Sequence, residues 1–489
     1  MSSVDLVVVI PGIMGSTLGV AHDGEPAAAR LIWAPTAGAV WNNLTGRARV
    51  TDFALPDGIG DSEPDDGVQP VGLMPDLHVL PGVWTPIKGY DVTMRHLEKQ
   101  VGLRPYLRDD PTPGQLMAFP YDWRLSNRVN ARRLKETVEP ALARLRSRGG
   151  QYRDAQLVLV CHSMGGLVAR WYLQMLGGAE VTRKLITIGT PWRGSTEAVL
   201  KLVNGAAPAL GRFQQPLLAF GRSLPSLYQL VPEFALIAHG ADFRKTTETD
   251  VPELETVRLA DSMAFYTDLL GSERADAGVR DRSHLLVGTR QPTWTTLTVD
   301  ADRRLVPSRA FGAQEEYGDG TVPLSGGLGL DLAPDTGGIV RVRDNHGNLQ
   351  RNPLVLDQIE EVVTASPVRR RSTAPVRIGV EVPELVLQGD PLRVLVQTEG
   401  GERAALRVRV LAEPGATGAA RLLYASQADV VDGEARVEIG ELPAGAHTVV
   451  VDSPPMPGQP STPGANLAGR VEPVTAATLV WPQETPEVT

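Results

Sequence analysis

One strand–turn–helix segment constrains the fold of this chain more than any other. Residues 157–160 (Leu-Val-Leu-Val) are typical of a buried strand, and residues 167–176 of an apolar helix. Between them, residues 161–166 (Cys-His-Ser-Met-Gly-Gly) must turn sharply, with Ser163 at the apex and two glycines that let the helix pack closely. Cys161 stands where the usual G-x-S-x-G pattern has its first glycine, and it is small enough for the turn. The segment therefore predicts a nucleophile elbow, which presents a serine hydroxyl at the N-terminus of a helix.

Apolar runs of similar length recur on both sides of this segment, separated by helical patterns. In residues 127–148 the apolar side chains form one stripe, and Pro140 lies inside the stretch, where a kink is expected. Alternating strands and helices favour an open, mostly parallel sheet covered on both faces. The predicted strands are residues 4–10, 115–119, 156–160, 184–188, 284–287 and 338–342. The predicted class is α/β, and the elbow makes it an α/β-hydrolase fold.

A serine hydroxyl needs a base to take its proton, and in this fold an acid and then a histidine follow the serine along the chain. His346 lies in the loop directly after the last predicted strand, where the base is expected. Three other histidines follow Ser163, in an insertion, in a predicted strand and in the C-terminal part: His239, His284 and His447. The sequence therefore predicts His346 as the base.

The acid is expected in the loop after the preceding strand. Asp319 lies there between two glycines, which let the loop bend the carboxylate towards an imidazole. Asp344 is the alternative, but it lies two residues before the base and is awkwardly placed to orient that ring. The predicted triad is Ser163, Asp319 and His346.

An oxyanion hole is also required, because the tetrahedral intermediate of acyl transfer places negative charge on oxygen. The backbone N–H of Met164, directly after the nucleophile, is one predicted donor. Residues 11–16 (Pro-Gly-Ile-Met-Gly-Ser) end the first predicted strand, and their glycines permit a close backbone approach. We assign the second donor to Ile13; a glycine-rich turn without a catalytic part is the alternative.

Two long stretches interrupt the alternation of strands and helices. Residues 20–88 are rich in Gly, Pro and Asp, and residues 196–282 are helical in pattern and apolar in places. Insertions of this length in an α/β enzyme commonly form a cap or a lid over the site. Covering exposed edges of the sheet is the alternative interpretation.

The character of the chain changes after residue 365. Residues 366–375 are typical of a linker and include three consecutive arginines, which indicate a solvated segment. Residues 376–489 contain short runs in which apolar and other residues alternate, as in Leu392, Val394 and Val396, and a stretch rich in Pro and Gly near the end. This period of two predicts a small antiparallel β-sandwich after a hydrolase domain at residues 1–365.

Composition limits the partners and the compartment. The formal net charge of −9 argues against nucleic-acid binding. The single cysteine excludes an internal disulfide, and the N-terminus lacks the basic region and cleavage site of a signal peptide. No apolar run approaches the length of about 18 residues that a transmembrane helix needs. We therefore expect a soluble, cytoplasmic protein. No H-E-x-x-H or Cys/His cluster is present, so neither a metal nor a cofactor is expected.

At these residues the chain resembles the lecithin:cholesterol acyltransferase family, which includes lysosomal phospholipase A2 and the phospholipid:diacylglycerol acyltransferases. Six matching segments occur in the family's order, at residues 10–16, 119–124, 162–166, 189–195, 224–232 and 318–323. The resemblance implies an acyl-enzyme mechanism on lipid esters, the triad above, oxyanion donors at Ile13 and Met164, and insertions that form cap and lid. It does not cover the β-rich part after residue 365. The signal peptide and disulfides of the extracellular and lysosomal relatives are absent.

The resemblance also implies a substrate pocket. The Tyr-Asp-Trp-Arg segment at residues 121–124 lies beside the pocket in the family, although local ion pairs between Asp122 and Arg124 are an equally good interpretation. The candidate pocket and lid residues are Met14, Trp33, Asp122, Trp123, Trp192 and Tyr228.

Three functions are compatible with these features. We expect hydrolysis of an acyl ester, with a lipid or phospholipid as substrate. The first alternative is an O-acyltransferase, which uses the same residues but passes the acyl group to an alcohol. The second is a hydrolase-fold scaffold whose β-sandwich binds a protein partner. Peripheral contact with a lipid surface is compatible with all three.

Overall fold

The computed structural model describes residues 4–22, 25–33, 53–75, 89–108, 110–205, 214–240, 242–251, 254–275, 278–301, 304–311, 314–328, 338–365, 378–383, 385–398, 404–412, 421–431, 433–454, 471 and 474–481. Among these residues, no helix has both the length and the apolar character needed to cross a bilayer.

A six-stranded sheet forms the centre of the larger part of the molecule. Its strand order is β15-β10-β7-β6-β1-β5, and every neighbouring pair is parallel. The strands are β1 (Leu6–Ile10), β5 (Leu116–Ala118), β6 (Leu157–His162), β7 (Thr182–Ile188), β10 (Ser283–Gly288) and β15 (Ile339–Val342). Each of the six predicted strands is one of these. β1 and β6 are buried along their whole length, which explains their continuous apolar sequence.

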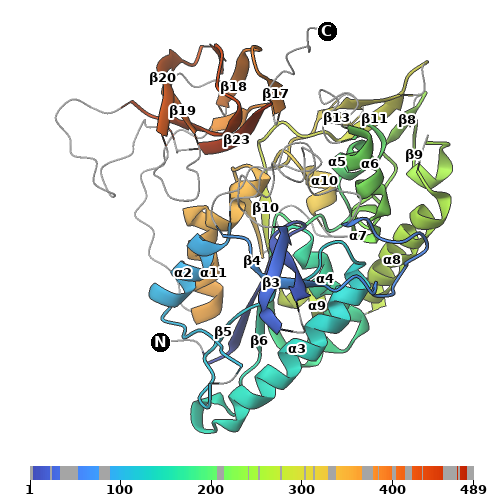
Figure 1. Cartoon of the computed structure of the whole chain (residues 1–489), viewed down its shortest axis with the longest axis vertical. Helices are drawn as coiled ribbons and strands as arrows, with labels where there is room; N and C mark the ends of the chain where they lie inside the picture. Colours follow the sequence, from blue (N-terminus) through green and yellow to red (C-terminus); the bar gives the residue numbers. More distant parts are fainter. Residues whose placement is uncertain are drawn as a thin grey trace.

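Helices cover both faces of this sheet. Figure 1 shows one pair on one side of the sheet and the remaining helices on the other. The pair consists of α2 (Asp91–Lys99) and α11 (Pro353–Thr364), and the other group contains α3 (Asn127–Ser147), α4 (Gly165–Met175), α8 (Thr256–Ala275) and α9 (Gly278–Arg282). α3 is the helix predicted at 127–148, with Pro140 inside it, and the side chain of Ser126 caps its first N–H groups. This arrangement confirms the α/β-hydrolase fold.

The two insertions contain strands that local sequence patterns did not predict. In the first, β2 (Ser16–His22), β3 (Glu25–Trp33) and β4 (Val68–Leu73) form an antiparallel sheet. In the second, three helices are followed by two short strands, which join strands from beyond β10 in a four-stranded sheet. The helices are α5 (Thr196–Val203), α6 (Gln214–Ser223) and α7 (Pro225–Tyr228), and the strands are β8 (Ile237–His239), β9 (Asp242–Arg244), β11 (Thr296–Val299) and β12 (Leu305–Ser308). β13 (Ala310–Phe311), β14 (Gln314–Glu315) and α10 (Leu324–Gly327) follow.

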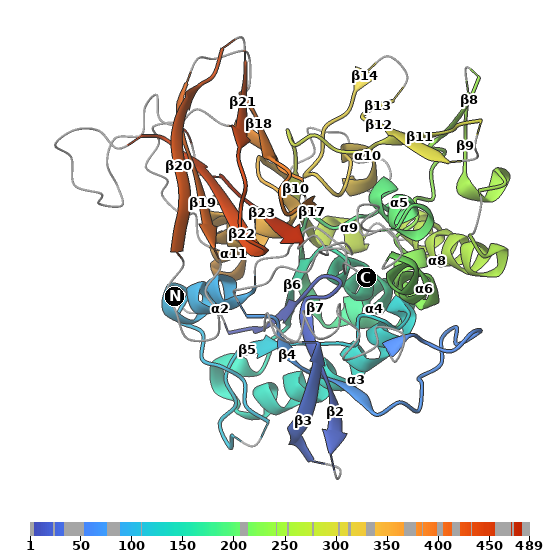
Figure 2. The ribbon, with the colours of Figure 1, turned by 45° about the horizontal axis from the view of Figure 1, so that its top comes forward.

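The C-terminal part is a β-rich unit with its own apolar core, drawn in orange to red at one end of the molecule in Figure 2. One sheet has the order β16-β18-β21 and the other β17-β23-β22-β19-β20. Its strands are β16 (Ile378–Glu381), β17 (Leu385–Leu387), β18 (Leu392–Thr398), β19 (Ala405–Ala412), β20 (Arg421–Asp429), β21 (Glu434–Ile439), β22 (Gly445–Asp452) and β23 (Val474–Trp481). All described pairs are antiparallel except β17 with β23. The predicted linker at 366–375 lies outside the described residues, so the domain boundary stays a prediction.

Candidate active site

Ser163 lies in a strained turn between β6 and α4. Its φ angle is 51°, a left-handed conformation that is uncommon outside glycine, and its side chain is buried. The two following glycines let the neighbouring segments approach closely. A Cβ atom on Gly165 would lie 2.3 Å from the carbonyl oxygen of Pro11, and one on Gly166 would lie 2.2 Å from Oγ1 of Thr190. The turn therefore requires both glycines, and it has the geometry of a nucleophile elbow.

The structure brings Ser163, His346 and Asp319 into one line of hydrogen bonds. Nε2 of His346 lies 2.8 Å from Oγ of Ser163, and Nδ1 lies 2.8 Å from Oδ2 of Asp319. The other carboxylate oxygen of Asp319 accepts the backbone N–H groups of Thr321 and Val322, at 3.0 and 2.7 Å. These bonds fix the carboxylate, and the carboxylate in turn fixes the ring and its tautomer.

Asp344, the alternative acid, has other partners. Its carboxylate accepts hydrogen bonds from the backbone N–H of Asn345 and from the side-chain amides of Asn348 and Asn352. All three partners belong to the segment that carries His346. Asp344 thus braces this loop, while Asp319 contacts the imidazole.

A second histidine, His162, links the loop after β1 to the backbone of His346. Its Nε2 lies 3.1 Å from the carbonyl oxygen of His346, and its Nδ1 lies 2.9 Å from the hydroxyl of Tyr90. The Tyr90 hydroxyl also accepts the N–H of Gly12, at 2.8 Å. A carbonyl oxygen accepts but cannot donate, so Nε2 of neutral His162 carries the proton and Nδ1 is an acceptor. Tyr90 must then donate its proton to Nδ1, and every group in the series has one assigned role.

The protonation states of His162 and Tyr90 support these donor and acceptor roles. Burial, together with the charge of nearby His346, lowers the pKa of His162 to about 3, although the bond to the His346 backbone opposes this shift. Burial raises the pKa of Tyr90 far above neutrality. Both groups are therefore neutral at neutral pH. Sequence reasoning gave neither residue a role: His162 was visible only as part of the elbow, and nothing near Tyr90 indicated its contact.

The loop after β1 lies against the nucleophile. A Cβ atom on Gly12 would be 2.8 Å from Cβ of Ser163 and 3.4 Å from its Oγ, so only glycine fits there. Met14 has a φ of 61°, which turns this loop tightly. Within the described part of the chain, the backbone N–H groups of Ile13 and Met164 make no hydrogen bond. Both predicted oxyanion donors are thus without a competing partner.

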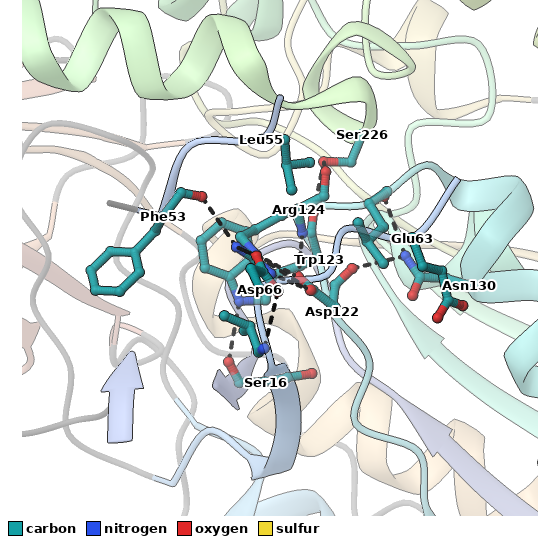
Figure 3. A network of polar contacts seen from close by, with 12 residues as sticks. Ser16, Phe53, Leu55, Glu63, Asp66, Asp122, Trp123, Arg124, Asn130 and Ser226 are labelled. Carbon is teal, nitrogen blue, oxygen red and sulfur yellow. Dashed lines mark hydrogen bonds and ion pairs between the residues drawn. The ribbon is translucent and has the colours of Figure 1, made fainter. Parts of the chain in front are cut away.

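The Tyr-Asp-Trp-Arg segment forms a polar network between distant parts of the chain (Figure 3). The guanidinium of Arg124 binds the carboxylate of Asp122 through Nε and Nη2, and Nη1 lies 2.8 Å from Asp66. Asp122 and Arg124 are each only 1% exposed. The indole N–H of Trp123 donates to the carbonyl oxygen of Ser16, at 3.2 Å. These contacts fit the interpretation in which Asp122 and Arg124 form local ion pairs. In this structural role, the segment holds the first insertion against the core.

The other pocket candidates fall into two places. The indole N–H of Trp33 donates to the carbonyl oxygen of Met14 at 3.2 Å, and its ring meets that of Trp123 edge-on at 5.0 Å. This group adjoins the loop after β1. Trp192 and Tyr228 are buried elsewhere, the first beneath the guanidinium of Arg170 at 4.1 Å and the second beside Arg258. Substrate contact by any of them stays a prediction.

The fold and these contacts define an α/β-hydrolase with a serine–histidine–aspartate arrangement at the elbow. Comparisons with known proteins narrow this class. Residues 111–268 match the family model of lecithin:cholesterol acyltransferase, which confirms the family resemblance over that segment.

Two further comparisons are more distant. A segment of 152 residues is 29% identical to an uncharacterized protein of Saccharomyces cerevisiae, YJR098C, and covers 31% of this chain and 20% of that protein. The chain thus spans about a fifth of the length of this curated relative. Among solved structures, the lipase BlEst2 of Bacillus licheniformis in its propeptide form aligns at 12% identity over 74% of this chain and 86% of that chain, with a TM-score of 0.30.

Proposed function

We propose that this protein hydrolyses acyl esters of lipids through an acyl-enzyme intermediate on Ser163. The observation that carries the proposal is the pair of 2.8 Å contacts that His346 makes with Ser163 and Asp319. The match to an acyltransferase family over residues 111–268 supports a lipid ester as the substrate.

In the first half of the reaction, Oγ of Ser163 attacks the acyl carbonyl while Nε2 of His346 takes its proton. The N–H groups of Ile13 and Met164 stabilise the oxyanion that forms. When the intermediate collapses, the protonated His346 gives its proton to the departing alkoxide, and the acyl group stays on Ser163. In the second half His346 removes a proton from water, the hydroxide attacks the acyl-enzyme, and Ser163 recovers its proton as the fatty acid leaves. Asp319 stabilises the imidazolium throughout.

Covalent labelling with a fluorophosphonate tests this mechanism. We expect the reagent to modify Ser163, located by peptide mass mapping, and Ser163→Ala to abolish the label. His346→Ala should slow turnover of a soluble ester by at least about a thousandfold, because the hydroxyl then has no base. Ser283→Ala is the control, since the hydroxyl of this buried serine at the start of β10 bonds to the carbonyl oxygen of Val279, away from the three side chains. Folded wild-type protein that resists the label with and without added liposomes would refute the proposal.

Transfer of the acyl group to an alcohol is the second candidate, because the matching family model is that of an acyltransferase. Both reactions share the acyl-enzyme and differ only in the molecule that attacks it. Products measured with increasing concentrations of an added alcohol separate the two. We expect free fatty acid to dominate; ester formation that outpaces fatty-acid release would make the protein a transferase.

A further inference from the structure

The first and last strands of the β-rich unit lie against the two loops that carry the proposed acid and base. β16 and β23 belong to different sheets of this unit, but the two strands contact each other. Figures 1 and 2 both show β23 on the side of the unit that faces the hydrolase sheet.

β23 is tied to the loop of the base. The hydroxyl of Thr475 donates to Oδ1 of Asn348, at 3.0 Å. The amide nitrogen of the same asparagine donates to the carboxylate of Asp344, at 3.1 Å, and this carboxylate also accepts the N–H of Asn345. One series of hydrogen bonds therefore runs from the β-rich unit to the residues on both sides of His346.

β16 is tied to the loop of the acid. The backbone N–H of Val380 donates to the side-chain oxygen of Gln291, at 3.2 Å, and Gln291 is fully buried. The backbone of Gln291 exchanges two hydrogen bonds with Gly318, at 2.9 and 3.1 Å. Gly318 directly precedes Asp319. Gly379 fits tightly here, because a Cβ atom on it would lie 3.0 Å from the carbonyl oxygen of Arg290.

An ion pair and a cleft complete this interface. Glu381 at the end of β16 pairs with Arg309 of the larger part, and the guanidinium of Arg309 lies 4.8 Å from the ring of Trp294. A cleft of about 220 Å³ lies between the two parts, and both Asp319 and Thr475 line it. The interface therefore extends to the acid itself.

We propose that the β-rich unit is a positioning domain, which holds the loops of Asp319 and His346 in register with Ser163. This inference rests on the proposed function. The nucleophile is fixed by the sheet and α4, whereas the acid and base lie on loops outside the strands of the sheet. The backbone N–H of His346 donates to the carbonyl oxygen of Asp319 at 2.8 Å, and both loops also bond to strands of one unit that contact each other, so that unit supports the spacing of the two loops from outside. Small displacements of reacting groups are costly, with about 1 Å worth roughly a hundredfold in rate.

Single substitutions in the full-length chain test this role. Thr475→Val keeps the shape of the side chain but removes its bond to Asn348, and Thr475→Ser keeps the hydroxyl. Thr478→Val is the matched control, because Thr478 lies on the same strand with a fully buried hydroxyl that has no partner in the described part of the chain. We expect Thr475→Val to lower kcat for a soluble ester about tenfold with KM within about twofold, in line with a displacement well below 1 Å. Thr475→Ser and Thr478→Val should keep wild-type kcat.

Hydrogen–deuterium exchange provides a readout that does not require activity. In Thr475→Val, amides of residues 344–351 should exchange faster than in the wild type, while those of residues 157–168 around the elbow stay unchanged. Gln291→Met, which removes the amide that binds Val380, should do the same for residues 318–323. Unchanged exchange in both loops, or equal losses of kcat in Thr475→Val and Thr478→Val, would overturn the positioning role. If exchange changes as expected in the two variants but the wild type is not labelled at Ser163, the proposed function alone is rejected.

Discussion

Two histidine rings lie 5.1 Å apart at this site and have different tasks. His346 contacts the nucleophile and the acid, whereas His162 is locked as a neutral link between Tyr90 and the His346 backbone. A second positive charge this close to His346 would be costly, because both rings are buried. In the proposed mechanism, His162 is thus a positioning residue that must stay neutral during the reaction.

The lowered pKa of His162 has a consequence for stability. The pKa is about 3 in the folded chain against 6.5 for a free histidine, so the unfolded chain binds the proton first as pH falls. The free energy of unfolding should therefore decrease from about pH 6.5 down to about pH 3, by at most about 1.4 kcal/mol per pH unit from this group. Urea unfolding between pH 7 and 5 measures the slope, and His162→Gln should flatten it. His284, whose pKa burial also lowers, should account for a smaller part. A slope that His162→Gln leaves intact would contradict this assignment.

The Tyr90 hydroxyl connects the loop after β1, which carries the proposed oxyanion donor Ile13, to His162, so its loss should affect rate as well as stability. Tyr90→Phe leaves the N–H of Gly12 and Nδ1 of His162 without their partner, at a cost of about 1–3 kcal/mol. We expect labelling of Ser163 to slow about tenfold, equivalent to a loss of about 1.4 kcal/mol of transition-state stabilisation. Tyr266→Phe is the control, because this equally buried hydroxyl donates to the carbonyl oxygen of Gln229, away from the elbow. It should lose stability without slowing the label; equal slowing in both variants would refute a specific role for Tyr90.

At the scale of elements, the elbow depends on how closely α4 approaches the end of β1. Gly165→Ala would place a methyl group 2.3 Å from the carbonyl oxygen of Pro11, which is backbone and cannot move freely. We expect a loss of about 1–3 kcal/mol in unfolding free energy from this overpacking. Gly271→Ala in α8 is the matched control, because no atom lies within 4 Å of the added methyl group. Alanine is the better helix former, so this change should stabilise the protein by about 0.5–1 kcal/mol. Thermal melts check whether Gly165→Ala destabilises the protein and whether Gly271→Ala stabilises it.

Elements that local pattern defines were predictable, whereas those that depend on distant partners were not. β1 and β6 are apolar throughout because both faces are covered, and their sequence reports this directly. β8 is three residues long and pairs with β11, some 60 positions along the chain, so no local period marks it. At the site, too, local sequence marked some residues and not others. The elbow and the predicted order of acid and base pointed to the three side chains that the structure brings together. The contact of Tyr90 with His162 joins residues far apart in sequence and left no signal.

At the scale of the whole molecule, two parts with separate apolar cores meet at an interface that includes polar contacts. The Arg309–Glu381 ion pair is the charged contact across it that the described residues show. Both side chains are partly exposed, so the pair is worth at most about 1 kcal/mol, but a charge reversal would place like charges together. We therefore expect Arg309→Glu, and separately Glu381→Arg, to shift the unfolding of the β-rich unit to lower temperature than that of the hydrolase core.

A calorimetric cycle with the double reversal tests whether charge is the cause. The variant carrying both Arg309→Glu and Glu381→Arg restores opposite charges across the interface. Most of the shift in the unfolding temperature of the β-rich unit should therefore disappear. Recovery should be incomplete, because the new side chain at position 309 no longer stacks on Trp294. If the β-rich unit of the double variant still unfolds as early as in either single variant, the two parts are joined by the backbone N–H of Val380 and the hydroxyl of Thr475 rather than by charge. In that case the loops of the proposed acid and base would carry the polar connection between the two cores that the described residues show.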